Sequence, residues 1–152
     1  FCAKNTGAAV PAPGELGGSD EALLAHADSL LQRMSEALDG QAIHTALQHW
    51  FDLVDAANKY IDVEAPWTLR KTDPARMQTV LWCLLEAIRQ LAILAQPFMP
   101  ASAGKMLDQL AVSEAARSFA HLGEAGRLRA GTPLPQPQGV FPRHVEAAKE
   151  GA

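Results

Sequence analysis

Apolar residues recur at helical spacing along two stretches in the first half of the chain. The first stretch, 20–38, follows Ser19, a residue type that often caps helices, and ends before Gly40. The second, 41–62, keeps the same period until Pro66, which disfavours helical backbone in the residue before it. The pattern therefore predicts two long amphipathic helices joined by a short turn.

A third stretch, 74–94, is the most apolar part of the chain. Asp73 and Pro74 stand in the order of a capping residue and a proline at the first helical position. The apolar stripe that follows is broad and stops before Pro97. Because a broad stripe can contact helices on two sides, we expect this helix at the centre of a bundle with nearly all its apolar positions buried.

Shorter elements complete the predicted fold. The stretch 101–110 predicts a shorter helix, and Ser113 is placed to cap one or two further turns at 114–120. Residues 127–130 are the only candidate for a short extended stretch. Four prolines in the last part of the chain suit an extended strap, anchored by its apolar residues Leu134, Val140 and Phe141.

These elements predict an all-α fold, an antiparallel helical bundle with an extended Pro-rich C-terminal strap. We expect three parts: 1–18, which contains a Pro/Gly linker; a helical bundle at 19–125; and the strap and tail at 126–152. The chain begins with Phe1 and shows no basic-then-apolar signal segment, so we expect it to be a fragment of a longer protein.

Composition and charge exclude several classes of protein. The formal net charge is −4, with the whole excess in 20–39, so no strong global field attracts nucleic acid or an anionic membrane. Two cysteines, Cys2 and Cys83, are too few for a disulfide framework, which predicts a reducing compartment, the cytoplasm or an organellar matrix. Polar residues interrupt the longest apolar run, 77–99, so we expect no membrane span.

The chain shows none of the common catalytic motifs. It has no Gly-rich phosphate loop and no nucleophile elbow, and its five histidines lack metal-ligand spacing. The acidic residues of 20–38 are expected to form the solvated face of a helix. We therefore predict no catalytic residue, no metal and no cofactor in this chain.

The most informative segment is 58–76, around the predicted end of the second helix. It places Asn58, Tyr60 and Trp67 together, and Pro66 stiffens the backbone just before the tryptophan. A fixed aromatic face suits stacking on an unpaired nucleic-acid base, and such stacking needs no net positive charge. The basic residues nearby, Lys59, Arg70 and Lys71, are candidates for phosphate contacts.

Packing is the alternative explanation of these aromatic residues. Aromatic side chains at helical spacing usually serve the core, so Tyr60 and Trp67 could fill a gap between the second and third helices. Trp50 and Trp82 lie within helices among apolar neighbours, and packing alone explains them.

Three motifs together carry a resemblance to a known family. They are Asn-Lys-Tyr-Ile at 58–61, Ala-Pro-Trp at 65–67 and Pro-Phe-Met-Pro at 97–100. Together with Asp-Pro-x-Arg at 73–76, they closely resemble the C-terminal anticodon-binding helical bundle of methionyl-tRNA synthetases. The resemblance spans about 20–110, and 139–143 also resembles the terminal strap of bacterial and organellar members.

The resemblance implies a function for the chain and roles for its residues. The parent enzyme of this family uses ATP, with Mg, to activate methionine and join it to methionine tRNA, through a catalytic domain upstream. The Trp67 position then stacks on an anticodon base and Pro66 shapes that site, while Asn58 and Tyr60 occupy positions beside it. The partners implied are methionine tRNA and the catalytic domain of the same chain.

The resemblance also implies that part of the site lies outside this chain. The family uses an Asn and an Arg in an Asn-Leu-x-x-Arg motif, expected just before Phe1, so that 1–9 would form the end of that upstream helix. The strap is expected to pack toward the catalytic domain. Two alternatives remain at this point: the equivalent domain of another class I synthetase, and a helical protein-interaction module without nucleic-acid binding.

Overall fold

The computed structural model describes residues 1–141, and the helices predicted from the sequence are present in it. The α-helices are α1 (Cys2–Asn5), α2 (Gly18–Asp39), α3 (Ile43–Glu64), α4 (Pro66–Thr72), α5 (Pro74–Ala95) and α6 (Pro100–Gln109). Three short 3-10 helices follow at Glu114–Ala116, Phe119–His121 and Gly123–Gly126. No strand occurs in residues 1–141, and the all-α prediction is confirmed.

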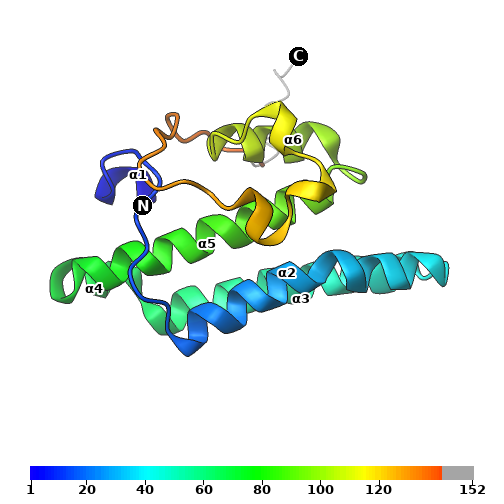
Figure 1. The fold of residues 1–152 in the computed structure, drawn as a ribbon, viewed down its shortest axis with the longest axis horizontal. Coiled ribbons are helices and arrows are strands. Elements are labelled where there is room, and N and C mark those ends of the chain that lie inside the picture. Colours follow the sequence, from blue (N-terminus) through cyan, green and yellow to red (C-terminus); the bar gives the residue numbers. More distant parts are fainter. Residues whose placement is uncertain (142–152) are drawn as a thin grey trace, which may run out of the picture.

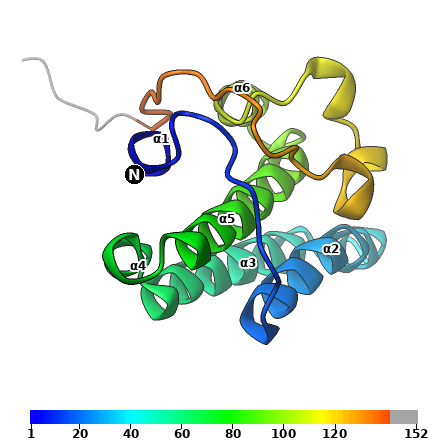
Figure 2. The ribbon, with the colours of Figure 1, turned by 60° about the vertical axis from the view of Figure 1, so that its left-hand side comes forward.

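Helix α5 occupies the centre of the molecule. Helices α2 and α3 form an antiparallel hairpin along one side of α5, while α6 and the C-terminal segment lie on its other side (Figures 1 and 2). Most of α5 is buried, including nearly all of its apolar positions from Met77 to Leu94, as its broad apolar stripe predicted. One apolar cluster joins it to α2 and α3 through residues such as Leu30, Leu53 and Val80. A second joins its C-terminal half to α6 through Ile93 and Leu107.

Helix α5 is long and apolar enough to cross a membrane, with a mean hydropathy of 1.3 over its most apolar window. It is the one helix of this kind in residues 1–141, and 83% of that window is buried inside the protein. Packing against α2, α3 and α6 therefore accounts for its composition.

The start of α2 differs in detail from the prediction. Gly17, not Ser19, is the N-cap, and the side chain of Asp20 accepts a 2.8 Å hydrogen bond from the Gly17 N–H. Ser19 instead donates its hydroxyl to Glu64 at 2.7 Å. Asp20, three residues after the N-cap, supplies the side-chain acceptor at this helix start, and it also accepts from Tyr60 and Arg76. At α5 the prediction is confirmed, since the Asp73 side chain accepts from the Arg76 N–H at 3.0 Å.

The one or two helical turns expected at 114–120 are present as 3-10 turns and not as α-helix. The chain forms two separate 3-10 turns there, and a third follows at Gly123–Gly126. This irregular segment is tied to α5 by polar side chains instead of continuing as a helix. Arg89 donates to the carbonyls of His121 at 2.6 Å and Gly123 at 3.1 Å, and Gln90 accepts from the Gly123 N–H at 3.3 Å.

The C-terminal segment lies beside the N-terminal one. Ala9 and Pro133 form an isolated antiparallel bridge, and the Leu134 N–H donates to the carbonyl of Ala8 at 2.8 Å. Leu134 packs against the core as expected, but Phe141 is 66% exposed and anchors nothing within residues 1–141. Val140 is half-buried. Residues 142–152, the end of the predicted strap and tail, lie outside the described residues.

Candidate nucleic-acid interface

The segment around Trp67 forms a helix that the sequence analysis did not separate from its neighbours. Helix α3 ends at Glu64, and the next residue, Ala65, has a φ of 44°, in the left-handed region. Pro66 is the first residue of α4 and is fully buried, as is permitted at a position where its missing N–H costs no hydrogen bond. Leu69 packs against the main core. The short helix α4 is therefore fixed at its first residue and through its inner face.

The outer face of α4 presents an aromatic ring and two cations. Trp67 is 50% exposed, and Arg70 and Lys71 are both exposed. Residues three and four positions apart lie on the same face of a helix, so the two cations are one turn from the indole. This arrangement matches an aromatic stacking platform with basic groups beside it.

Asn58 and Lys59 lie exposed on α3, as a binding role requires, but Tyr60 does not. The Tyr60 side chain is buried, and its hydroxyl donates to a carboxylate oxygen of Asp20. On an ideal helix, Asn58 and Tyr60 point about 160° apart, so the two cannot face one ligand. The expectation that Tyr60 lies beside Trp67 at the surface is corrected: its hydroxyl is held by the core.

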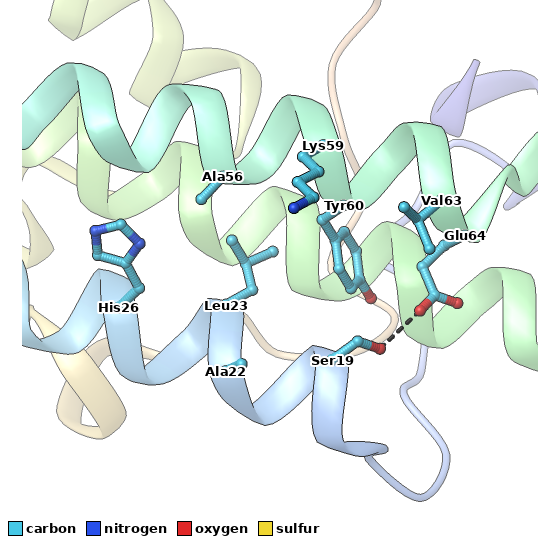
Figure 3. Close-up of a pocket in the computed structure, with 9 residues that line it drawn as sticks. All are labelled: Ser19, Ala22, Leu23, His26, Ala56, Lys59, Tyr60, Val63 and Glu64. Atoms are coloured by element: carbon cyan, nitrogen blue, oxygen red, sulfur yellow. Dashed lines mark hydrogen bonds between the residues drawn. The ribbon is translucent and has the colours of Figure 1, made fainter.

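Tyr60 also lines a groove of about 360 Å³ between α2 and α3, with His26, Lys59 and Val63 at its sides (Figure 3). Figure 3 shows the Ser19 hydroxyl donating to Glu64 at one end of this groove. The groove is mainly apolar and contains no cluster of catalytic groups.

A buried ionic network lies at the base of α4. Asp20 is fully buried, and both of its carboxylate oxygens accept from the guanidinium of Arg76, one of them at 2.9 Å from Nη2. The same guanidinium pairs with Glu64, with 2.8 Å between Nη2 and Oε2. Asp20 was expected on the solvated face of its helix, so this expectation is wrong. The sequence pattern alone could not reveal the partners, which are 40 and 56 positions away.

The titration behaviour of the network follows from its contacts. Burial works to raise the pKa of Asp20, but hydrogen bonds from Arg76, Tyr60 and Gly17 outweigh it and hold that pKa below its usual value of 3.8. Burial, reinforced by Asp20, raises the pKa of Tyr60. Burial raises the pKa of the Cys83 thiol to about 11, which leaves it a poor nucleophile. Ionised Asp20 therefore acts as an acceptor that holds its neighbours together.

No group of three metal-ligating side chains occurs within the described part of the chain. His26 and His49 both contact Arg33, at 2.9 Å each. A guanidinium between two imidazoles disfavours a bound cation, so these histidines do not form a metal site.

The comparison with protein families decides between the readings left open by the sequence. Residues 10–151 match the family described as the anticodon binding domain of methionyl tRNA ligase. The chain belongs to this family. The resemblance read from the three motifs is thereby confirmed, and the domain of another synthetase and the protein-interaction module are set aside.

Individual relatives agree with the family and show how much of them the chain covers. The chain is 52% identical to the methionine–tRNA ligase of Rhizobium meliloti over 142 residues, 93% of this chain and 28% of that protein. It is 47% identical to the methionine–tRNA ligase of Mycobacterium leprae, again with 28% of that protein covered. The chain thus spans about 28% of the length of these curated relatives.

The fold is also that of solved synthetase structures. The apo crystal structure of Mycobacterium tuberculosis methionyl-tRNA synthetase is similar with a TM-score of 0.90 and 47% identity, over 96% of this chain and 30% of that one. The same enzyme in complex with methionyl-adenylate gives a TM-score of 0.89 and 49% identity.

Proposed function

We propose that this chain is the anticodon-recognition domain of a methionine–tRNA ligase and that it binds the anticodon loop of methionine tRNA through α4. The observation that carries the proposal is the half-exposed indole of Trp67, which follows directly on the buried Pro66. A large aromatic side chain that is held at its backbone and open on one face is suited to stacking on an unpaired base. Membership of the family supports the same assignment.

The residues around Trp67 have complementary roles in this proposal. Stacking on one base contributes about 1–3 kcal/mol. Arg70 and Lys71, one turn along α4, neutralise phosphates of the loop, and Lys59 does the same from α3. Asn58, exposed about 9 Å before the end of α3, offers an amide to a base edge. These contacts are local, so they do not require a positive net charge.

The rest of the proposed activity belongs to the longer protein. Its catalytic domain uses ATP and Mg to activate methionine and transfers it to the tRNA that this domain has bound. The described residues contribute binding and position, and we assign them no catalytic role. We propose the cytoplasm, or an organellar matrix, as the place of action.

Aminoacylation by the full-length ligase tests the proposal. Replacing Trp67 by Ala is expected to lower kcat/KM for methionine tRNA by roughly 5- to 150-fold, the equivalent of one lost stacking contact. Methionine-dependent pyrophosphate exchange, which needs no tRNA, should remain near the wild-type value.

Trp50→Ala provides the control. Trp50 is partly buried and donates its indole N–H to the Leu91 carbonyl at 3.0 Å, so its loss should lower the melting temperature and affect every activity together. If Trp67→Ala lowers the melting temperature similarly but leaves the tRNA kinetics unchanged, Trp67 is a packing residue and the proposal is wrong.

A further inference from the structure

The two ends of the segment that carries Trp67 are joined by an ion pair between Glu64 and the guanidinium of Arg76. Glu64 is the last residue of α3, directly before this segment, and Arg76 lies in the first turn of α5, directly after it. Their side chains meet at 3.2 Å between Nε and Oε2 and at 2.8 Å between Nη2 and Oε2. The ion pair therefore closes a loop of chain that includes all of α4.

The same guanidinium fixes this loop to a second element. Arg76 donates from Nη1 and Nη2 to the two carboxylate oxygens of Asp20, in the first turn of α2. Asp20 is fully buried and also accepts from the Tyr60 hydroxyl and the Gly17 N–H. Glu64 accepts in turn from Ser19. Arg76 thus connects α2, α3 and α5 at the point where α4 leaves the bundle.

The backbone between Glu64 and Pro66 contains an unfavourable conformation that surrounding contacts must maintain. Ala65 adopts a left-handed conformation, with φ 44° and ψ 63°, and it precedes a proline. A residue with a Cβ rarely adopts this conformation, which persists only where surrounding contacts enforce it. The Glu64–Arg76 pair starts at the residue next to Ala65, so it restrains the turn that sets the direction of α4.

Arg76 itself is not available to nucleic acid. Its Nε, Nη1 and Nη2 all donate to carboxylates within the protein. It differs in this from Arg70, which is exposed on α4 and has no ion pair within residues 1–141. Arg76 can therefore influence binding only through the position of the residues it holds.

We propose that Arg76 and Glu64 form an ionic clamp that positions Trp67 for its base, with Arg76 as a positioning residue. This inference rests on the proposed function, because it requires that Trp67 contacts tRNA. Without the clamp the indole is still present but can adopt other orientations. Ordering it on binding then costs free energy and lowers the affinity for tRNA.

The decisive experiment is a double-mutant cycle in the full-length ligase. Glu64→Gln and Arg76→Gln are each prepared with Trp67 intact and with Trp67→Ala, and kcat and KM for methionine tRNA are measured well below the melting temperature of every variant. Glu64→Gln removes only one arm of the clamp and leaves Asp20 paired. It therefore decides the question even where Arg76→Gln fails to fold.

With Trp67 intact, each clamp variant is expected to lower kcat/KM for tRNA by roughly 3- to 30-fold, mainly through KM. In the Trp67→Ala background the same substitutions should have less than about a twofold effect, since no indole remains to be positioned. Pyrophosphate exchange should be unchanged. Arg33→Gln is the matched control, because it removes another cross-helix arginine, paired with Asp52 at 3.5 Å and about 20 Å along α2 from Asp20.

Two outcomes overturn the clamp while the proposed function stands: Glu64→Gln has no effect on tRNA kinetics, or it has the same effect in both backgrounds. A different outcome, no effect of Trp67→Ala alone, contradicts the proposed function and removes the basis of the clamp with it.

Discussion

Helix α5 carries two arginines that pair with carboxylates inside the protein, and they hold very different parts of the chain. The Arg89 side chain is 1% exposed, and its carboxylate partner, Glu86, lies one turn away on the same helix. The Arg76 side chain is 23% exposed, and its partners lie on α2 and α3. One arginine therefore lies deep within the fold and the other lies where an exposed helix leaves it.

The difference follows from what each arginine supports. Residues 114–141 form no α-helix, so the carbonyls of this segment need donors from elsewhere, and Arg89 provides them to His121 and Gly123. Glu86 accepts from Arg127 on the other side. Around α4, by contrast, Arg76 donates to no carbonyl in the described residues. It pairs with two carboxylates, Glu64 at the start of the segment and Asp20 on α2, and so restrains the direction of α4.

The largest loss of stability is expected at Arg89, the more deeply buried of the two arginines. Arg89→Met should lower the free energy of unfolding by about 3–5 kcal/mol, because it leaves the buried Glu86 charge without its main partner and two carbonyls without donors. Urea unfolding measures the change. Arg70→Met, on the exposed face of α4, should change the stability by less than about 0.5 kcal/mol. Equal effects for the two variants would contradict the structural role assigned to Arg89.

A smaller loss is expected at the network around Arg76. Tyr60→Phe keeps the buried ring but removes the hydroxyl that donates to Asp20, and it should cost about 1–2 kcal/mol. The cost is lower than at Arg89 because Asp20 still accepts from Arg76 and Gly17. Urea unfolding is again the measurement. A loss above that of Arg89→Met would reverse the ranking of the two networks.

The proposed phosphate contacts of α4 can be tested by measuring how tRNA binding depends on salt concentration. Lys71→Gln in the full-length ligase should weaken tRNA binding and reduce the slope of log K against log salt by about 0.7, the contribution of one phosphate on a single strand. Lys105→Gln, at an exposed position on α6, is the control and should leave the slope unchanged. An equal reduction at both sites would mean that α4 has no privileged contact with the tRNA.

The smallest effect is expected at a third, more exposed group of charges on α2 and α3. Partial burial, followed by the charge of Arg33, lowers the pKa of His26 below 6.5. The unfolded chain therefore binds the proton more readily, so stability should decrease as the pH falls through the window just below 6.5 and should be constant above it. His26→Gln should remove this part of the pH dependence of urea unfolding. His44→Gln, at an exposed position, should not.

Sequence patterns predicted most helices because their causes are local. The apolar period of α2, α3 and α5 and the Asp73–Pro74 start of α5 are visible within single turns of chain. One or two helical turns were predicted at 114–120 because Ser113 can cap them and the residues that follow permit them. The 3-10 turns found there are held by Arg89 as a donor and Gln90 as an acceptor, both more than 30 positions away.

In the candidate site, too, local sequence predicted one residue correctly as exposed, and a distant partner decided the position of another. Trp67 was found from its own neighbours, since Pro66 and the motif around it are contiguous in sequence. Tyr60 was misplaced because adjacency in sequence says nothing about which side of α3 a residue faces once α2 has packed against it. Its hydroxyl is taken by Asp20, 40 positions earlier.

By itself, then, the sequence determined the helical class, the central position of α5, the family and the candidate stacking residue. Periodicity, capping and contiguous motifs are all short-range properties. Only the tertiary structure decided that α4 is a separate helix and that Asp20 is buried. It also decided that Arg76 faces carboxylates and not solvent. The reason is physical: an ionised group can be buried only when packing brings its partners to it, and the partners of Asp20 come from helices that are distant from it in the chain.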